Sequence, residues 1–458
     1  MSFPESIHAL VLAAGKGTRM RSNLPKVLHT LLGEPMLWYI HQTLEKLFGD
    51  RVHTVIGCGA DKVQAAFPER QGRFVIQAEQ LGTGHALQVA WESIMSLGLR
   101  HVVIVNGDTP LLPANRVQQL VDAALTGNAA LAFLSITPSD PGAYGRVLRG
   151  DDGAVTAIVE AKDYDVAAHG PDRGEVNAGI YFLDMQLMAS LLPLLKNENK
   201  SGEFYITDLV NLAVSQGLSV TAVQCGEQPE LMGINSPFEL VCAEERLAAA
   251  IAAEWLQKGV LVRNPGLARI GPRVALEPGA EISGPCELYG RTVVHCGARV
   301  DSNCVVRDSE LDSGAHLRHF SHAEGARLGP GSIAGPYVRL RPGAVLEECA
   351  HAGNFVELKK AVLGKGAKAN HLTYLGDVEV GEGTNIGAGT ITCNYDGKLK
   401  HKTVIGRNVF IGSNTALVAP ITVGDESLVG AGSTLTKNVE PGELAIARQR
   451  QKNLKRRK

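Results

Sequence analysis

The chain has 458 residues and a formal net charge of -2, and its length predicts two or three domains rather than a single core. The balanced charge excludes a general attraction to nucleic acid or to anionic membranes, so we expect neither as a partner. No stretch reaches the length of a membrane span, the N-terminus lacks a signal-like pattern and the eight cysteines form no C-x-x-C pair, which favours a cytoplasmic protein with reduced thiols.

The first apolar run, Ile7 to Leu12, leads into a glycine-rich segment from Ala13 to Met20. This pattern predicts a buried strand followed by a loop whose small residues let backbone N–H groups approach an anion. Lys16 and Arg19 add positive charge to the same loop. The segment is neither a P-loop nor a dinucleotide-binding fingerprint. An ordinary strand-to-helix turn would contain similar glycines, so the loop alone leaves both interpretations open.

Further strand-like runs alternate with helical stretches along the first part of the chain. The runs are 52–56, 74–77 and 102–105, and the helical stretches are 36–47 and 85–96. Such alternation predicts an α/β fold with a mostly parallel, Rossmann-like sheet. In sheets of this kind ligands bind at the carboxyl ends of the strands.

Polar residues follow two of these strands. Gln77 begins the segment that leads to Gly82-Thr83-Gly84, and Asn106-Gly107-Asp108-Thr109-Pro110 follows the run 102–105. An aspartate at a strand end, beside a phosphate-binding loop, is suited to a hard cation that bridges carboxylate and phosphate oxygens. Taken alone, Asp-Thr-Pro is also favourable turn chemistry. The neighbouring glycine loop favours the cation.

A helix is predicted between the two halves of the chain. Ser236-Pro237-Phe238-Glu239 is a capping box with proline at the first helical position. The following segment is rich in Ala, Leu and Glu, continues to Lys258 and ends at Gly259, as a helix with a glycine stop does. Asn235 directly precedes the cap, so the residues alone favour a turn role for it.

Aliphatic residues recur at a step of six through the second half. Six fits neither a helix nor simple strand alternation, so the repeat predicts a solenoid of short strands and turns. Two segments, His371 to Asp377 and Cys393 to Thr403, break the pattern, the second as an extruded loop. The repeating positions are Ile270, Leu276, Ile282, Leu288, Val294, Val300 and Val306, and Ile405, Ile411, Leu417, Val423, Val429 and Leu435.

We expect chemistry in this solenoid where the repeat is interrupted. His371 lies in the first interruption, downstream of a segment rich in lysine. A histidine that titrates near neutrality can take a proton from an amine nucleophile. A hydrogen-bonded surface histidine is the competing explanation.

Several motifs together resemble a known family. Leu12 to Met20, Pro25 to Leu28 and Gly82 to Ala86 resemble the sugar-phosphate nucleotidyltransferases, and Asn370 to Asp377 resembles an acetyltransferase motif. With the six-residue repeat, the chain resembles, over essentially its full length, the bifunctional N-acetylglucosamine-1-phosphate uridyltransferase/glucosamine-1-phosphate acetyltransferases of bacteria.

The resemblance implies a definite domain organisation. It predicts an α/β nucleotidyltransferase domain over residues 1–235, a linker helix over 236–259, and a left-handed parallel β-helix of hexapeptide repeats over 260–458 that carries the acetyltransferase and a basic C-terminal tail. Columns of this family pack as homotrimers. The product, UDP-N-acetylglucosamine, would supply peptidoglycan and lipopolysaccharide synthesis.

For the uridyltransferase, the resemblance implies attack of the sugar's anomeric phosphate on the α-phosphorus of UTP, with release of pyrophosphate. Mg²⁺ and cationic side chains would neutralise the charge. Arg19 and Lys26 would act on the phosphates, and Asp108 and Asn235 would bind the Mg²⁺.

The remaining assignments in the first domain concern substrate binding. Each position is, by the residues alone, only a polar or small residue at the end of an apolar run. The resemblance gives Leu12, Ala13, Ala14, Gly15, Lys26, Gly107, Asp108 and Asn235 to the nucleotide and its metal, Gln77, Gly82 and Thr83 to the uracil, and Gly145, Glu160 and Asn177 to the sugar.

For the acetyltransferase, the resemblance makes His371 the general base for the amine of glucosamine-1-phosphate, which attacks the thioester of acetyl-CoA. Acetylation would precede uridylyl transfer. Arg341 and Lys359 would bind the sugar phosphate, Tyr374 and Asn385 the sugar, and Ala388, Asn394, Tyr395, Ser413, Ala431 and Arg448 the acetyl-CoA.

One position departs from the family pattern, because Asn106 stands where a tyrosine often precedes Gly-Asp. The tail from Arg448 to Lys458 carries seven basic residues; it is either a solvated end or a segment that approaches the phosphates of coenzyme A. Two alternatives to the bifunctional enzyme stay open from the fold: a non-catalytic assembly or regulatory subunit, and a mono-functional nucleotidyltransferase whose column only oligomerises.

Overall fold

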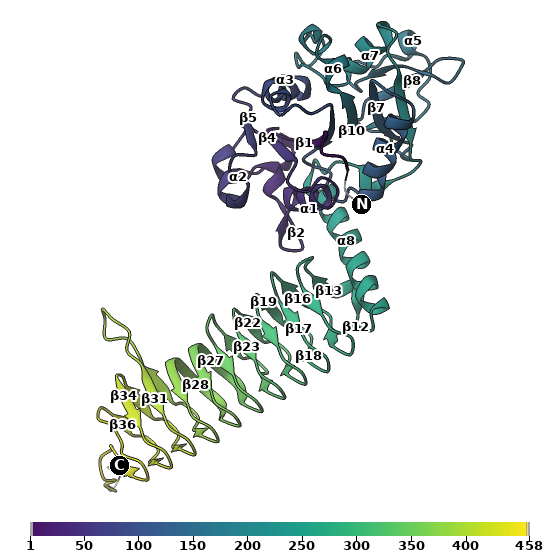
Figure 1. Ribbon diagram of the computed structural model, residues 1–458. Coiled ribbons are helices and arrows are strands. Elements are labelled where there is room, and N and C mark those ends of the chain that lie inside the picture. Colours follow the sequence, from purple (N-terminus) through teal and green to yellow (C-terminus); the bar gives the residue numbers. More distant parts are fainter. Residues whose placement is uncertain (1–2, 455, 457–458) are drawn as a thin grey trace. The chain divides into compact units, whose positions relative to one another are not determined.

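The computed structural model describes residues 3–454 and 456. The chain divides into two compact units, residues 1–244 and 245–458. A sheet flanked by helices forms the first unit, and a stack of short strands forms most of the second (Figure 1). None of the helices in these described ranges combines the length and apolar character that crossing a bilayer requires.

The main sheet of the first unit has the strand order β11-β7-β10-β6-β1-β4-β5. Four of its six neighbouring pairs are parallel, and β10 runs antiparallel to both of its neighbours. The expected α/β fold with a mostly parallel sheet is therefore confirmed. The strands are β1 (Ile7–Ala13), β4 (Val52–Ile56), β5 (Phe74–Ile76), β6 (His101–Asn106), β7 (Leu131–Ile136), β10 (Val176–Asp184) and β11 (Val220–Gln224), with β8 (Arg146–Arg149) and β9 (Val155–Val159) paired beside β10 and a separate hairpin of β2 (Thr30–Leu31) and β3 (Glu34–Pro35).

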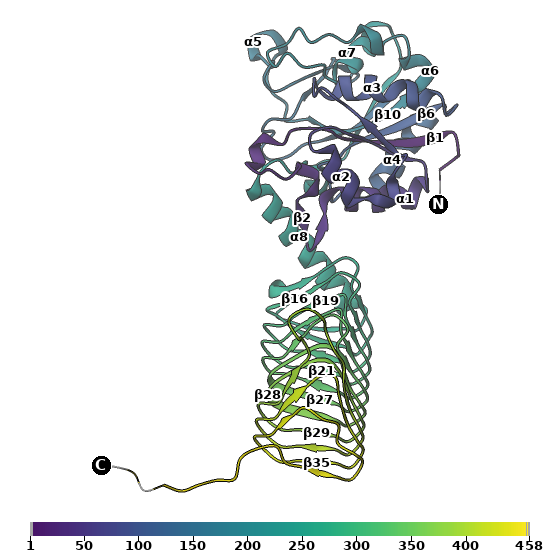
Figure 2. The same ribbon diagram turned by 90° about the vertical axis from the view of Figure 1, so that its left-hand side faces the viewer.

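Helices cover both faces of this sheet (Figure 2). Successive side chains of β1 point to opposite faces: Ala9 and Val11 join one buried cluster, and Leu10 and Leu12 join the other. The helices α1 (Met36–Phe48) and α4 (Ala114–Thr126) contribute to the first cluster, and α3 (Thr83–Met95) and α7 (Asp208–Ser215) contribute to the second. The unit also contains three short helices, α2 (Ala60–Ala66), α5 (Val166–His169) and α6 (Met185–Met188).

The predicted linker helix is α8 (Pro237–Gln257). Its capping box is formed as the sequence indicated: Glu239 N donates to Ser236 Oγ at 3.3 Å, and Ser236 N donates to Glu239 Oε2 at 3.1 Å. Gly259 follows with φ +85°. Since the two units divide within this helix, the domain boundaries at 235/236 and 259/260 stay a prediction.

The second unit is a parallel β-helix that runs from β12 (Leu261–Arg263) to β37 (Leu444–Ala445). Along most of the stack each strand pairs in parallel with the strand three further along, so that three short strands complete one coil. All thirteen repeating aliphatic residues are at most 5% exposed and belong to one continuous core. The predicted solenoid is therefore confirmed, and its left-handed sense stays a prediction.

The interruption expected at His371 is not a break in the column, and that expectation was wrong. Two long strands, β27 (His351–Leu363) and β28 (Lys368–Val380), pair in parallel there. The chain turns the corners of the coil within β28 at Leu372 (φ 46°) and Asp377 (φ 50°). The strand keeps its pairing there and still contributes Ala369, Leu375 and Val380 to the core. The second interruption is an extruded loop between β30 (Ile391–Cys393) and β31 (Thr403–Ile405), as predicted.

Candidate active sites

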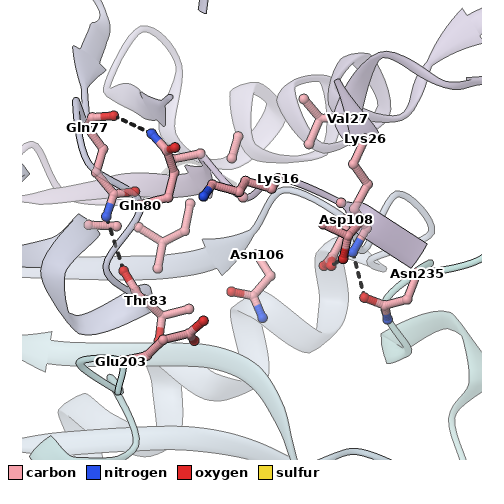
Figure 3. A pocket seen from close by; sticks show the side chains of 18 of the residues that line it. Lys16, Lys26, Val27, Gln77, Gln80, Thr83, Asn106, Asp108, Glu203 and Asn235 are labelled. Atoms are coloured by element: carbon pink, nitrogen blue, oxygen red, sulfur yellow. Dashed lines mark hydrogen bonds and ion pairs between the residues drawn. The ribbon is translucent and has the colours of Figure 1, made fainter. Parts of the chain in front are cut away.

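A cavity of about 450 Å³ lies in the first unit, at the carboxyl ends of β1 and β6 (Figure 3). Its position agrees with the rule for ligand sites in parallel sheets, and its volume lies in the range of small-molecule sites. Eleven of the residues assigned from the sequence line it, namely Leu12, Ala13, Ala14, Gly15, Arg19, Lys26, Gln77, Gly82, Thr83, Asp108 and Asn235.

Glycines allow the segments of this cavity to approach each other closely. A Cβ at Gly17, which has φ +58°, would lie 2.6 Å from the Cβ of Lys26. At Gly107 the backbone N–H donates to Leu12 O at 2.8 Å, and a Cβ would lie 2.8 Å from that of Ala13. The glycine loop therefore brings Lys26 beside Asp108, which follows Gly107.

Lys26 lies at the centre of a polar network. Its Nζ donates to Oδ2 of Asp108 and, at 2.7 Å, to Oδ1 of Asn235. Arg19 Nη2 donates to the same oxygen of Asn235 at 2.7 Å. The amide of Asn235 is oriented by its Nδ2, which donates to Gly233 O at 3.1 Å. Two oxygens from distant parts of the chain, those of Asp108 and Asn235, thus contact the same ammonium group, Lys26 Nζ.

The oxygen atoms of Asp108 and Asn235 can be compared with the ligands that Mg²⁺ prefers. Magnesium prefers carboxylate and carbonyl oxygens and leaves room for phosphate oxygens and water. The carboxylate of Asp108 and the amide oxygen of Asn235 already share one positive group, Lys26 Nζ. The donor set therefore fits a hard divalent cation.

At another part of the cavity, a buried glutamine faces a fixed turn. Gln77 is 2% exposed, and its Nε2 donates to Gly82 O at 3.2 Å. Gly82 has φ +115°, and a Cβ there would lie 2.4 Å from Phe204 O. Thr83 Oγ1 accepts from the backbone N–H of Ile206 at 3.1 Å. The turn is therefore fixed by the segment 204–206, far along the chain.

Gly145, Glu160 and Asn177 lie together but do not line this cavity. Asn177 N donates to Gly145 O at 2.9 Å, and a Cβ at Gly145 would lie 3.5 Å from Glu160 Oε1. Thr207 Oγ1 donates to the same glutamate oxygen at 2.9 Å. Burial raises the pKa of Glu160, with Thr207 opposing and Asp208 adding to the rise.

Sequence reasoning missed several residues of the cavity wall. Lys16 was noted only as part of the glycine loop, and Asn106 only as a departure from the family pattern. Glu203 gave no signal, because it reaches the cavity only through the packing of the segment 204–206 against Gly82. The residues that line the cavity without having been assigned to it are Lys16, Gly17, Thr18, Val27, Gln80, Ala86, Asn106 and Glu203.

In the second unit, His371 is held by a neighbour that sequence reasoning also missed. Asn354 is its register partner on β27, and Asn354 Oδ1 lies 2.8 Å from His371 Nδ1. With the amide oxygen as acceptor, Nδ1 carries the proton and Nε2 is the basic nitrogen. Thr373 Oγ1 donates to His371 O at 2.7 Å. The imidazole is exposed, and its Nδ1 is held by Asn354.

A cationic cluster lies on the adjoining strands. Lys400, from the extruded loop, and Arg341 both lower the pKa of Lys359, with Lys400 the larger influence and Asp377 opposing. Arg341 Nη1 donates to Glu357 Oε1 at 2.9 Å. Three positive groups this close favour an anion between them. Lys400 was not assigned from the sequence, and only its place in the loop could have indicated it.

Only some of the positions assigned to acetyl-CoA lie close to one another in the structure. Ala388, Ser413 and Ala431 lie one coil apart along one corner, since Ala388 O accepts from Asn414 N at 2.7 Å and Ser413 O accepts from Gly432 N at 2.8 Å. Of the other positions assigned to acetyl-CoA, Asn394 and Tyr395 lie at the start of the loop, and Arg448 is exposed beyond β37. The two positions assigned to the sugar lie on separate strands. Tyr374 on β28 is the register partner of Glu357, and Asn385 on β29 (Asn385–Ile386) is the register partner of Lys368.

The amide of Asn394 donates to Asp377 Oδ2 at 2.6 Å, which ties the start of the extruded loop to β28. The hypothesis on the basic tail falls partly outside the described residues, at Lys455, Arg457 and Lys458.

Comparison with known proteins agrees with both halves of this geometry. The family model of the MobA-like NTP transferase domain matches residues 9–172, and that of the hexapeptide repeat of succinyl-transferase matches residues 402–437. The bifunctional protein GlmU of Oleidesulfovibrio alaskensis is 58% identical over 448 residues, which cover 98% of this chain and 97% of that protein. The chain belongs to the bifunctional GlmU family. The GlmU proteins of Lawsonia intracellularis and Pseudomonas putida are 42% and 43% identical, each over 98% of this chain.

Family membership decides between the alternatives left open by the sequence. As a GlmU protein the chain is an enzyme with two transferase activities, a uridyltransferase and an acetyltransferase. The non-catalytic subunit and the mono-functional nucleotidyltransferase are therefore set aside. The roles of individual residues stay predictions.

Proposed function

We propose that this GlmU chain makes UDP-N-acetylglucosamine in two steps. Acetyl-CoA acetylates glucosamine-1-phosphate, and the released N-acetylglucosamine-1-phosphate then receives a uridylyl group from UTP with release of pyrophosphate. The observation that carries the proposal is the convergence of Arg19, Lys26, Asp108 and Asn235 in one cavity, in a chain that belongs throughout its length to a bifunctional family.

In the uridyltransferase cavity, the chain supplies positive charge where phosphates must react. Arg19 and Lys26 neutralise the triphosphate, and neutralisation with correct positioning is most of what phosphoryl transfer requires. Asp108 and Asn235 would hold Mg²⁺, which when bound supplies further charge neutralisation and orientation of phosphate oxygens. Lys26 exchanges its contacts with Asp108 and Asn235 for phosphate oxygens when the nucleotide arrives.

The uracil and the sugar occupy different surroundings in this proposal. Gln77, Gly82 and Thr83 offer amide and backbone groups that suit the polar edge of a base. Glu160 and Asn177 offer acceptors and donors for sugar hydroxyls, and Gly145 keeps the space beside Glu160 open. Polar groups fixed by other contacts, such as the bond from Thr207 to Glu160, bind a substrate with little loss of side-chain entropy.

In the acetyltransferase site, His371 Nε2 accepts the proton of the substrate amine as its nitrogen attacks the thioester carbonyl. A new C–N bond forms, the C–S bond breaks, and the sulfur of coenzyme A leaves with the proton that His371 took from the amine. Arg341 and Lys359 bind the sugar phosphate, together with Lys400. Tyr374 and Asn385 would position the sugar, and Ala388, Asn394, Tyr395, Ser413, Ala431 and Arg448 would bind acetyl-CoA.

The proposal includes a cytoplasmic homotrimer built on the column. Phe320, Tyr337 and Phe355 are about half exposed and stack on successive coils, with ring centroids 5.0 and 5.3 Å apart. A continuous exposed apolar ladder of this kind favours burial against another chain. All eight cysteines are free, in agreement with a reducing compartment.

An omission assay tests the proposed function. Purified protein is incubated with glucosamine-1-phosphate, acetyl-CoA, UTP and Mg²⁺, and each component is left out in turn. Coenzyme A release should require only the first two. UDP-N-acetylglucosamine should require all four, and should form without acetyl-CoA when N-acetylglucosamine-1-phosphate is supplied. UDP-sugar formation from unacetylated substrate at the full rate would contradict the order proposed.

A further inference from the structure

We infer that the first coils of the column carry a transition-metal site formed by His295, Glu310 and Asp312. These residues lie far from His371 along the stack and take no part in either proposed reaction. His295 Nε2 lies 3.0 Å from Glu310 Oε1 and 3.9 Å from Asp312 Oδ1. The three atoms all lie within 4.8 Å of one another. Ligand atoms around a tetrahedral zinc ion are about 3.3 Å apart, so small side-chain shifts suffice.

The other polar atoms of these ligands are already held, as in known metal centres. Glu277 Oε1 lies 2.9 Å from His295 Nδ1 and fixes the ring with Nε2 toward the carboxylates. Arg327 contacts the outer oxygens, Oδ2 of Asp312 at 2.8 Å and Oε2 of Glu310 at 3.8 Å. Oδ1 and Oε1 are therefore the oxygens that face His295. A carboxylate behind a ligating histidine fixes its tautomer and raises its basicity.

The charges of the cluster suit a divalent ion. Three carboxylates, of Glu277, Glu310 and Asp312, face one guanidinium, that of Arg327, and an imidazole. With the imidazole neutral, the group has a net charge of about -2. One nitrogen and two carboxylate oxygens favour a first-row ion such as Zn²⁺ over Mg²⁺ or Ca²⁺.

The positions of these residues on the backbone would let a bound ion link neighbouring coils of the column. Glu277, His295 and Asp312 follow β14 (Ala275–Leu276), β17 (Val293–Val294) and β20 (Glu310–Leu311), which pair in parallel on three successive coils. Side chains on such a rigid face are well positioned as ligands. A solenoid is stabilised by contacts between neighbouring coils. An ion that is shared by two coils and binds only the folded state would raise the midpoint of thermal unfolding of the column.

Zinc titration of the full chain tests the inference. Calorimetry and a thermal melt with ZnCl₂ are run on the wild type, on His295→Gln and Asp312→Asn, and on His316→Gln as the matched control. His316 is also partly exposed and lies 2.9 Å from one carboxylate, that of Asp301. Asp108→Asn is included to separate zinc bound in the uridyltransferase cavity.

We expect one zinc ion to bind with micromolar or tighter affinity and to raise the melting midpoint. His295→Gln and Asp312→Asn should weaken this binding at least tenfold, whereas His316→Gln and Asp108→Asn should retain it. Unchanged acetyltransferase activity in His295→Gln would show that the column is folded. Equal zinc affinity in the wild type and in folded His295→Gln would overturn the inference and leave the cluster as an ion-pair network.

Discussion

At the scale of single residues, the uridyltransferase cavity depends on shared oxygen atoms. Asn235 Oδ1 accepts from both Arg19 and Lys26, and Lys26 also contacts Asp108. Removal of any one group leaves charges in the cavity without their counterpart, which is costly where water is partly excluded. Substitutions here should therefore affect uridylyl transfer more than folding, because the network lines a cavity and is not part of the hydrophobic core.

Asp108→Ala gives the clearest prediction for this network. It should reduce Mg²⁺-dependent UDP-sugar formation by about a hundredfold or more, as loss of a group that stabilises transition-state charge does, and should leave coenzyme A release intact. Separate assays of the two half-reactions measure this, with Asp61→Ala in the exposed first turn of α2 as the control. Loss of both activities in a folded protein would argue against two independent sites.

His371 and Asn354 should differ in what they contribute to acetyl transfer. His371→Ala should lower coenzyme A release by about 10²–10⁴-fold, the usual contribution of a general base, without affecting uridylyl transfer. Asn354→Ala should cause a smaller fall in kcat with little change in KM, because Asn354 orients the imidazole through Nδ1. Its pH–rate profile should also shift. Near-normal acetyl transfer in His371→Ala would remove this residue from the mechanism.

The buried carboxyl of Glu160, which we propose binds the sugar, also affects the stability of the folded chain. Burial raises its pKa from 4.5, so the protonated carboxyl is favoured more in the folded state than in the unfolded state. Its ionisation therefore lowers stability as pH rises above the unfolded value and through the folded one. Glu160→Gln should raise the melting midpoint at pH 7 to 8 and weaken sugar-phosphate binding, and the stability gain should disappear near pH 4. A gain that is independent of pH between 4 and 8 would contradict this explanation.

At the scale of elements, periodicity determined how much of the structure could be predicted. The six-residue repeat predicted the buried positions of the column, because one aliphatic residue per short strand must face the common core. The Ser236–Glu239 capping box predicted the start of α8. The expectation of a break at His371 was wrong, since strands β27 and β28 keep both their parallel pairing and their aliphatic core residues there. Glu203 and Asn354 could not be predicted, because only tertiary packing brings them to the sites, and the sole sequence signal for Lys400 was its place in the extruded loop.

The column offers a direct test of its core. Leu288 is fully buried between coils, whereas Leu267 is 57% exposed. Leu288→Ala should lower the free energy of unfolding by about 2–5 kcal/mol, through lost apolar burial and the cavity that remains. Leu267→Ala should change it by less than about 0.5 kcal/mol. Urea unfolding followed by circular dichroism measures both, and similar effects of the two substitutions would contradict the assignment of the core.

At the scale of the whole molecule, the two sites belong to separate compact units with separate cores. The contacts of each site lie within one unit. The uridyltransferase network lies in residues 1–244, and the groups around His371 lie in residues 245–458. In the proposed scheme, the order of the two reactions follows from their chemistry, because N-acetylglucosamine-1-phosphate is the product of acetylation and the substrate of uridylyl transfer.

Mixing two inactive variants tests this independence. Asp108→Ala should still acetylate glucosamine-1-phosphate, and His371→Ala should still convert N-acetylglucosamine-1-phosphate and UTP to the UDP-sugar. If the intermediate is released into solution, as proposed, the mixture should restore UDP-N-acetylglucosamine synthesis after a lag, during which the intermediate accumulates. The lag should shorten as the amount of Asp108→Ala is raised. Two variants that are each active in their own half-reaction but inactive when mixed would mean that the intermediate is passed between the sites without release.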